Sequence, residues 1–239
     1  MKVIIATIRS WNIKNTIEFM KNNPNISVLP IFEKEELNFC NVKNFNPDYI
    51  FFPHWSSYIP AEIYENYKCV VFHPSDLPFG RGGSPVQNLI SLGLKETKIS
   101  AINVCKELDA GDVYIKEKIS LLGSAEEIFI NISNIIFHKM IPQIIEKEII
   151  LTPQIGEIVT FNRRKPEQSV MPMNANLAAL YDHIRMLDAE EYPKAYIEYG
   201  NFKIIISNAV RRVDSIEGIV EIKLKEDEKN NYLWNWKRV

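Results

Sequence analysis

The chain has 239 residues, of which 46% are hydrophobic and 24% are charged. This length suits one large domain with an appendage or two modest domains, and the composition excludes a long disordered, collagen-like or coiled-coil chain. The 28 lysines and arginines against 30 aspartates and glutamates give a net charge of −2. No overall positive field therefore favours a nucleic-acid partner, although a local basic patch can bind a small anion.

The first half of the chain alternates short apolar runs, typical of buried strands, with amphipathic stretches, typical of helices. Strands are predicted at 2–6, 26–31, 48–52, 69–72, 97–105 and 113–122, and helices at 12–22, 61–66 and 86–92. Ser124 and Glu127 have capping-box spacing and open a long helix that Pro142 is expected to kink. Repeated strand–helix alternation predicts an α/β fold, with a Rossmann-like, mostly parallel sheet and helices on both faces.

After residue 150 the pattern changes to a small α+β region with a helix and a β-hairpin. A polar connector over 161–166 precedes one amphipathic helix over 175–187. Two alternating runs at 195–199 and 202–207, separated by Gly200-Asn201, predict the hairpin, and 218–224 is a candidate third strand. The predicted organisation is therefore a main domain over 1–150 and a small C-terminal region over 151–239.

The cysteines and the N-terminus indicate the compartment. Cys40, Cys69 and Cys105 are odd in number, far apart and outside any C-x-x-C pair. They predict neither a disulfide framework nor a zinc site, and they fit a reducing cytosol. The N-terminus does not resemble a signal peptide, and no run of about 18 apolar residues predicts a membrane span. We expect a cytoplasmic protein that binds neither a metal nor a membrane.

The chemistry is expected in the turn-rich, glycine-rich segment that follows the strand at 69–72. This segment matches neither the G-x-G-x-x-G pattern of a dinucleotide site nor a nucleoside-triphosphate loop. It begins with His73 at the carboxyl end of a strand, where open α/β sheets bind ligands. Asp109 lies between the next two predicted strands, with Asp112 as a competing candidate nearby. A carboxylate orients an imidazole and stabilises its cation, so His73 and Asp109 form a candidate acid/base pair.

Two sequence elements in register resemble the folate-dependent formyltransferases. The segment His73-Pro-Ser-Asp-Leu-Pro-Phe-Gly-Arg-Gly-Gly-Ser-Pro85, followed by Leu108-Asp-Ala-Gly-Asp112, is similar to the N-x-H-x-S-L-L-P-x-x-R-G-x-x-P and D-x-G elements of that family. The resemblance covers roughly 1–150, and Phe161-Asn-Arg-Arg-Lys-Pro-Glu167 is similar to the R-R-x-P-E entry into the C-terminal region of its tRNA and sugar members. It implies transfer of a formyl group from 10-formyltetrahydrofolate to a primary amine, with no metal.

The family's catalytic asparagine, histidine and aspartate map unevenly onto this chain. The resemblance places His73 and Asp109 at the histidine and aspartate positions, whereas Val71 stands at the asparagine position and cannot donate a hydrogen bond. Losing one such donor to the oxyanion raises a barrier by about 3–4 kcal/mol. His54, at the end of the preceding strand, and Asn88, on the helix after the loop, are candidate substitutes. Cationic His73 is a third.

The resemblance also implies where the two substrates bind. The loop after the strand at 48–52 lies where family members bind the pteridine ring, on which its aromatic side chains can stack. The predicted folate contacts are Phe52, Pro53, Trp55, Ser56, Leu77 and Asp112. The predicted acceptor contacts are Arg81, Gly82, Gly83, Arg163, Arg185 and Lys194, the last three as candidates for a diphosphate. In a second interpretation, Arg81 instead braces its loop by hydrogen-bonding to carbonyl oxygens.

Charge and length indicate the acceptor amine. A tRNA acceptor needs basic surface and, in the family, a substantial C-terminal domain, whereas this chain has a pI near 6.1. As the main interpretation, the resemblance then implies the family branch whose acceptor is a UDP- or dTDP-linked amino-dideoxy sugar of surface polysaccharide (lipopolysaccharide O-antigen) synthesis, and it implies a homodimer. The alternatives are a methionyl-tRNA formyltransferase, or an inactive relative that binds folate or a nucleotide sugar.

Overall fold

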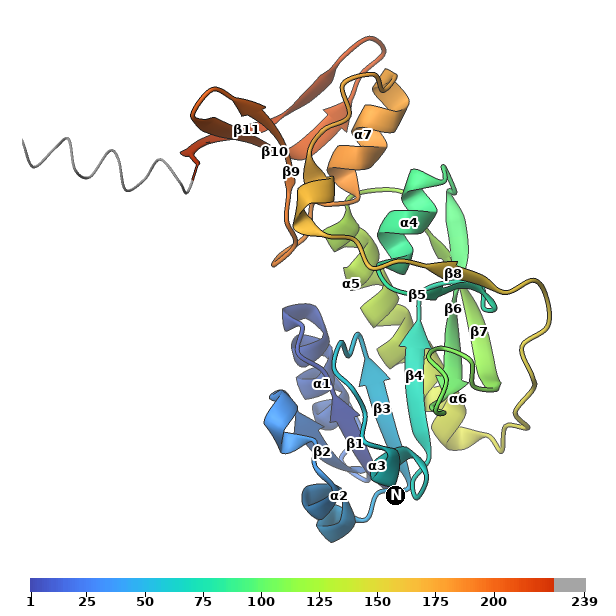
Figure 1. Ribbon diagram of the computed structural model, residues 1–239. Coiled ribbons are helices and arrows are strands. Elements are labelled where there is room, and N and C mark those ends of the chain that lie inside the picture. Colours follow the sequence, from blue (N-terminus) through green and yellow to red (C-terminus); the bar gives the residue numbers. More distant parts are fainter. Residues whose placement is uncertain (226–239) are drawn as a thin grey trace, which may run out of the picture. The chain divides into compact units, whose positions relative to one another are not determined.

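The computed structural model describes residues 1–225, which form two compact units (Figure 1). Unit 1 consists of Met1–Pro85, Lys95–Leu121 and Ile128–Asn162, and unit 2 of Val86–Leu94, Leu122–Glu127 and the described residues from 163 onward. Two short segments of the first half thus belong to unit 2, so the units interleave along the chain. The division into domains at residue 150 stays a prediction, and 226–239 lie outside the described residues.

Unit 1 is built on a six-stranded sheet of order β2-β1-β3-β4-β6-β7. Its strands are β1 (Lys2–Ala6), β2 (Ser27–Ile31), β3 (Tyr49–Pro53), β4 (Cys69–His73), β6 (Glu96–Asn103) and β7 (Val113–Ser120). The first four pair in parallel, whereas β6 and β7 run antiparallel to their neighbours. The mostly parallel sheet is confirmed, and β7 reverses direction because a turn without a helix joins it to β6.

Helices cover both faces of the parallel half of the sheet. They are α1 (Ser10–Asn22), α2 (Phe39–Phe45) and α3 (Ala61–Tyr64), with a 3-10 turn, η1, at Lys34–Glu36. The chain crosses from β1 to β2 in one direction and from β2 to β3 and β4 in the other. Since such crossovers are right-handed, α1 lies on one face and α2 and α3 on the opposite face.

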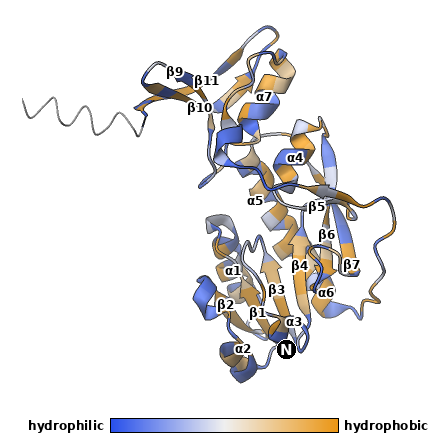
Figure 2. Cartoon of the chain, viewed as in Figure 1, coloured by the Kyte–Doolittle hydropathy of each residue, from blue (hydrophilic) through white to orange (hydrophobic). Residues whose placement is uncertain are grey.

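The central strands β1, β3 and β4 are buried on both sides, as this layering requires. Ile4 and Phe52 belong to a buried cluster that also contains Val42 of α2. Ile5 and Phe51, one residue away along the same strands, point to the opposite face and are fully buried as well. Figure 2 shows the resulting concentration of hydrophobic residues in β1, β3 and β4. Near-continuous apolar runs, and not alternating ones, are typical of such strands.

A long helix follows β7 and packs beside α1. It consists of α5 (Ala125–Ile135), a π-helical stretch η2 (Ile136–Met140) and α6 (Ile141–Glu146). Trp11 of α1 stacks on Phe129 at 5.5 Å between ring centroids. Pro142 lies in the first turn of α6, directly after the π-helical stretch, and the predicted kink stays a prediction.

The same helix corrects one expectation from the sequence. Within residues 1–225, the 22-residue segment Ala125–Glu146 alone has the length and composition of a helix that could cross a membrane. No such run was expected. Half of its most apolar stretch is buried inside the protein, as in the core helix of an α/β unit.

A two-stranded parallel ribbon of β5 (Phe79–Gly82) and β8 (Val159–Phe161) was not predicted. The glycines in the sequence of β5 indicate a turn. In the structure, Gly80 and Gly82 have positive φ angles of 84° and 98°, which glycine adopts readily. A Cβ on Gly82 would lie 2.4 Å from the carbonyl oxygen of Phe161. The glycines therefore let β8 approach β5, the next strand after His73 in the sequence.

Unit 2 contains a three-stranded antiparallel sheet of order β11-β10-β9 and the helix α7. Its elements are α4 (Pro85–Ser91), η3 (Pro166–Ser169), α7 (Leu177–Arg185), β9 (Ala195–Tyr199), β10 (Phe202–Arg211) and β11 (Ile216–Leu224). The predicted hairpin is confirmed, since Tyr199 pairs with Phe202 across a turn in which Gly200 has a φ of 54°. The third strand is confirmed as well.

Candidate active site

His73 is the last residue of β4, at the carboxyl edge of the parallel sheet, and only 8% of it is exposed. Its Nε2 lies 2.8 Å from the carbonyl oxygen of Gly80, and its Nδ1 lies 3.4 Å from Oδ2 of Asp109. Both partners are acceptors. Because a neutral imidazole has one N–H and an imidazolium has two, only the cationic ring donates to both partners at once.

Asp109 lies in the turn between β6 and β7, with a left-handed backbone φ of 53°. Its Oδ2 accepts a hydrogen bond from the backbone N–H of Gly82 at 2.9 Å. A non-glycine residue in this region is uncommon, and such residues gather at functional sites, where the surroundings hold them. The strand β5 therefore contacts both members of the pair, His73 through Gly80 and Asp109 through Gly82.

Gly111 makes the close approach of this turn to the sheet possible. A Cβ at residue 111 would lie 1.7 Å from the carbonyl oxygen of Asn103, the last residue of β6. No side chain fits there, which explains the glycine of the D-x-G element in steric terms. The structure thus brings together the two residues that the sequence predicts as a pair, and their catalytic role stays a prediction.

Val71 lies in an apolar environment that explains its side chain. It pairs with Phe52 on one side and Ile102 on the other within the sheet. Its side chain packs against the buried cluster of Leu77, Ile102 and Val113. Val71 and His73 are two residues apart on β4 and so share one face of the sheet. The position therefore offers no donor to a reacting group.

Of the two candidate substitutes, His54 follows β3 directly, and its ring lies among aromatic side chains. Its centroid is 4.9 Å from that of Phe129 and 5.7 Å from that of Trp11. Burial, together with the nearby Arg9 guanidinium, lowers the pKa of His54 to about 3. At neutral pH this ring is uncharged, so it is a hydrogen-bonding group and not a general acid. Asn88 lies on α4, in unit 2.

Comparisons with known proteins assign this arrangement to a family. A family model described as formyl transferase matches residues 20–129, and one described as methionyl-tRNA formyltransferase, C-terminal domain, matches residues 166–223. A solved structure described as methionyl-tRNA formyltransferase from Clostridium thermocellum is 51% identical, with a TM-score of 0.93, and the match covers 94% of this chain and 100% of that chain. This chain belongs to the formyltransferase family.

Two further relatives show the range of similarity. A curated methionyl-tRNA formyltransferase of Sulfurihydrogenibium sp. (strain YO3AOP1) is 25% identical over 89% of this chain and 70% of its own length. A 4-N formyltransferase from Francisella tularensis is 16% identical, with a TM-score of 0.69, over 89% of this chain and 98% of that chain. The second likeness shows a shared fold. The resemblance found in the sequence is therefore confirmed.

In this formyltransferase, two of the predicted folate contacts are core residues. Phe52 and Leu77 are 1% and 0% exposed. The backbone of Leu77 is also engaged, because its N–H donates to Ser100 Oγ at 3.3 Å and its carbonyl oxygen accepts from Lys116 Nζ at 2.5 Å. Both side chains therefore belong to the core, and their contact with folate stays a prediction. Apolar side chains beside a loop are as typical of a core as of a ligand site.

The other predicted folate contacts differ in their accessibility. Pro53 is buried, and its carbonyl oxygen accepts a hydrogen bond from Asn12 Nδ2 at 3.1 Å. Trp55 is half-buried, and its indole Nε1 is a buried donor with no hydrogen-bond partner among residues 1–225. Ser56 and Asp112 are exposed. A buried donor of this kind is satisfied by a water or by a ligand, so the contact of Trp55 with folate stays a prediction.

The predicted acceptor contacts on β5 already have partners inside unit 1. Arg81 donates from Nε and Nη2 to Gln154 Oε1 at 3.1 and 2.8 Å, and its Nη1 lies 3.3 Å from Glu107 Oε1. The N–H groups of Gly82 and Gly83 bond to Asp109 and to the Phe161 carbonyl. Arg81 thus braces β5, although its partners are side-chain oxygens and not the backbone carbonyls of the second interpretation, and its contact with the acceptor stays a prediction.

In unit 2, two of the three cations assigned to a diphosphate have internal partners. Arg185 is 3% exposed, and it bonds to Asp182 Oδ1 at 2.7 Å and to the Gly123 carbonyl at 2.8 Å. Lys194 Nζ lies 2.5 Å from Oδ1 of the buried Asp188. Both have structural partners inside unit 2, and their assignment to a diphosphate stays a prediction. Arg163 is exposed and stays a candidate.

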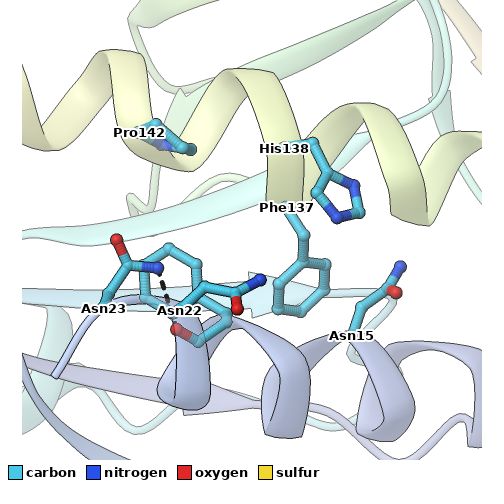
Figure 3. Close-up of a pocket in the computed structure, with 7 residues that line it drawn as sticks. Asn15, Asn22, Asn23, Phe137, His138 and Pro142 are labelled. Carbon is cyan, nitrogen blue, oxygen red and sulfur yellow. Dashed lines mark hydrogen bonds between the residues drawn. The ribbon is translucent and has the colours of Figure 1, made fainter.

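A small cavity of about 160 Å³ lies between α1 and the long helix, apart from the His73–Asp109 pair (Figure 3). Its lining residues are Asn15, Phe19, Asn22, Asn23, Phe137, His138 and Pro142. The side chain of Asn23 bonds to the backbone of its own helix, at Phe19 O. The cavity has no titratable pair comparable to that at the sheet edge.

Proposed function

We propose that this formyltransferase moves the formyl group of 10-formyltetrahydrofolate to the amino group of methionyl-tRNA. The support is the 51% identity to the whole of a chain described as a methionyl-tRNA formyltransferase. The C-terminal family model, which carries the same description, matches unit 2 at 166–223. These comparisons favour the tRNA alternative of the sequence analysis over its main interpretation, an amino sugar.

The observation that carries the reaction is the His73–Asp109 pair at the carboxyl edge of the sheet. The neutral amine attacks the formyl carbon, and its proton passes to Asp109 or to a water. The bond from the formyl carbon to the folate nitrogen then breaks as that nitrogen gains the proton that Asp109 or the water took from the amine. Cationic His73, held by Asp109, stabilises the oxyanion. Because Val71 supplies no donor, His73 has a larger share of this task than in relatives with an asparagine.

The folate would lie along the loop that follows β3. Trp55 offers an aromatic surface and the buried indole N–H described above. Ser56 on the same loop and Asp112 beside the catalytic turn are exposed polar groups that can bond to the ring edge. When bound, the folate supplies the activated formyl group, and the residues of the chain orient it and move protons.

A nucleotide-linked amino-dideoxy sugar is the second candidate acceptor. The net charge of −2 favours it, because a polyanion such as tRNA is bound through an excess of cations. The burial of Arg185 weakens it, because a side chain that is 3% exposed is poorly placed to bind a diphosphate. For either acceptor we propose a cytoplasmic homodimer, and the free thiols of Cys40, Cys69 and Cys105 support a reducing compartment.

Mass spectrometry separates the candidates. The purified chain is incubated with 10-formyltetrahydrofolate and either methionyl-tRNA or a panel of UDP- and dTDP-linked amino sugars, and each product is examined for the gain of one formyl group. We expect formylation of methionyl-tRNA. Formylation of a sugar alone establishes the second candidate. No transfer to any acceptor, with retained folate binding, identifies an inactive relative.

A further inference from the structure

The backbone of Asp109 is held by a side chain from a distant part of the chain. A positive φ in a residue other than glycine is unfavourable by about 1 kcal/mol or more, so neighbouring groups must stabilise it. The Asp109 carboxylate is fixed by the Gly82 N–H. Its backbone is fixed by Gln154, whose Nε2 donates to the carbonyl oxygens of Asp109 and of Gly111, each at 2.8 Å.

The side-chain amide of Gln154 uses both of its N–H donors and its oxygen acceptor in hydrogen bonds with other residues of unit 1. The two N–H bonds of Nε2 go to the turn, and Oε1 accepts two N–H bonds from the Arg81 guanidinium. Arg81 lies between Gly80, which contacts His73, and Gly82, which contacts Asp109. Gln154 therefore joins the turn to the strand that contacts both members of the pair.

The main chain around Gln154 is anchored on both sides. Thr152 forms a two-way bridge with Val113 of β7, with N–H to oxygen distances of 2.8 and 3.1 Å. A few residues beyond Gln154, β8 pairs with β5. A side chain with a fixed backbone and all of its hydrogen bonds satisfied holds the groups that it contacts in one position.

We propose that Gln154 is a positioning residue that holds the Asp109 turn, and thereby places the Asp109 carboxylate beside His73. The expected effect of Gln154 on turnover rests on the proposed function, whereas its effect on the position of the turn does not. Gln154 touches neither member of the pair through their side chains, so it acts through the backbone of the turn. Arg81 serves as its brace from β5.

Two substitutions at residue 154 separate hydrogen bonding from simple packing. Gln154→Ala removes the whole amide. Gln154→Glu keeps the size of the side chain and its bond to Arg81, but an ionised carboxylate cannot donate to the carbonyls of Asp109 and Gly111. We expect each variant to lower kcat about 10- to 100-fold with KM for the folate changed less than about threefold, because small displacements of a reacting group have effects of this size.

The matched control is Glu107→Gln. Glu107 is the other partner of Arg81, and its side chain is 77% exposed. This variant removes an ion pair of Arg81 but leaves the bonds of Gln154 to the turn in place. We expect kcat within about twofold of the original value, since exposed ion pairs contribute little.

Amide hydrogen exchange at Gly82, measured by NMR, tests the proposal without any activity. The Gly82 N–H is protected by the Asp109 carboxylate, and Asp109→Ala gives the rate without that partner. We expect Gly82 exchange to rise about tenfold in both residue-154 variants and to stay unchanged in Glu107→Gln. Unchanged Gly82 exchange, or full kcat in Gln154→Glu, overturns the proposal. If the original chain transfers no formyl group, the proposed function fails and the exchange rates alone decide on Gln154.

Discussion

Asp109 is the residue on which the proposed proton transfer depends most directly. Asp109→Asn keeps an oxygen that can accept the Gly82 N–H, so we expect the fold to persist, with Tm within a few degrees of the original. The amide cannot take a proton or stabilise cationic His73, so we expect kcat to fall by about 10²- to 10⁴-fold. Steady-state formyl transfer and thermal unfolding measure the two effects. Near-original turnover in Asp109→Asn excludes the assigned role.

Gly111 is a purely steric requirement, because the carbonyl oxygen of Asn103 occupies the space of its missing Cβ. Gly111→Ala must displace either the turn or the end of β6, and we expect a loss of about 1–3 kcal/mol of stability. Gly93→Ala is the control, since Gly93 has a positive φ of 80° but no atom within 4 Å of the added Cβ. In urea unfolding, Gly111→Ala should lose more stability than Gly93→Ala. The reverse order would contradict the steric account.

His54 makes stability depend on pH. Its pKa is about 3 in the folded chain, against 6.5 for an unperturbed histidine. As the pH falls below about 6.5, the unfolded chain gains a proton that the folded chain does not bind, so stability is lost toward pH 3, by at most about 1.4 kcal/mol per pH unit. His54→Phe, which cannot titrate, should lose less stability between pH 7 and pH 5. Urea unfolding at both pH values measures this.

A second histidine, His183, also contributes to the pH dependence of stability, and the comparison of the two proteins removes its contribution. Burial also lowers the pKa of His183, so this residue adds to the acid loss in both proteins. The difference between the original chain and His54→Phe therefore isolates His54. Equal losses in the two proteins would show that His54 binds a proton in the folded chain.

At the scale of elements, the sequence was sufficient where burial follows a simple pattern. The strands β1, β3 and β4 are short β-branched or aromatic runs, and their ends lie within one or two residues of those expected. The helix α2 is absent from the sequence prediction because it has only seven residues, although Asn38 caps it by accepting from Asn41 N–H at 3.0 Å. An asparagine at this spacing was the signal that identifies such a helix.

The ribbon of β5 and β8 could not be predicted, because its partners are about eighty residues apart and its glycines indicate a turn. The same limit applies to the site. His73 and Asp109 lie in motifs and were found, whereas Gln154 lies in no motif and contacts Asp109 through tertiary structure alone. A basic residue on an amphipathic helix is usually exposed, whereas Arg185 is buried and its charge is stabilised by Asp182.

At the scale of the whole molecule, the acceptor depends on how charge is distributed and not on its total. The net charge of −2 is an average over 58 charged side chains, 28 positive and 30 negative. Unit 2 has exposed cations at Arg163, Lys165 and Arg211. A few cations of this kind are enough to bind tRNA phosphates without making the chain basic overall.

Salt dependence therefore tests the acceptor independently of sequence similarity. Log affinity falls as log salt rises, and each phosphate contact makes the slope steeper by about 0.7–0.9. Three contacts therefore raise KM for methionyl-tRNA more than about tenfold between 50 and 200 mM salt. The double variant Arg163→Ala/Lys165→Ala should lower that slope by about 1–2. KM for the folate serves as the internal reference, because a small anion releases few counterions. A KM for methionyl-tRNA that is no more salt-dependent than that of the folate would exclude a phosphate-binding surface and favour the nucleotide-linked amino sugar.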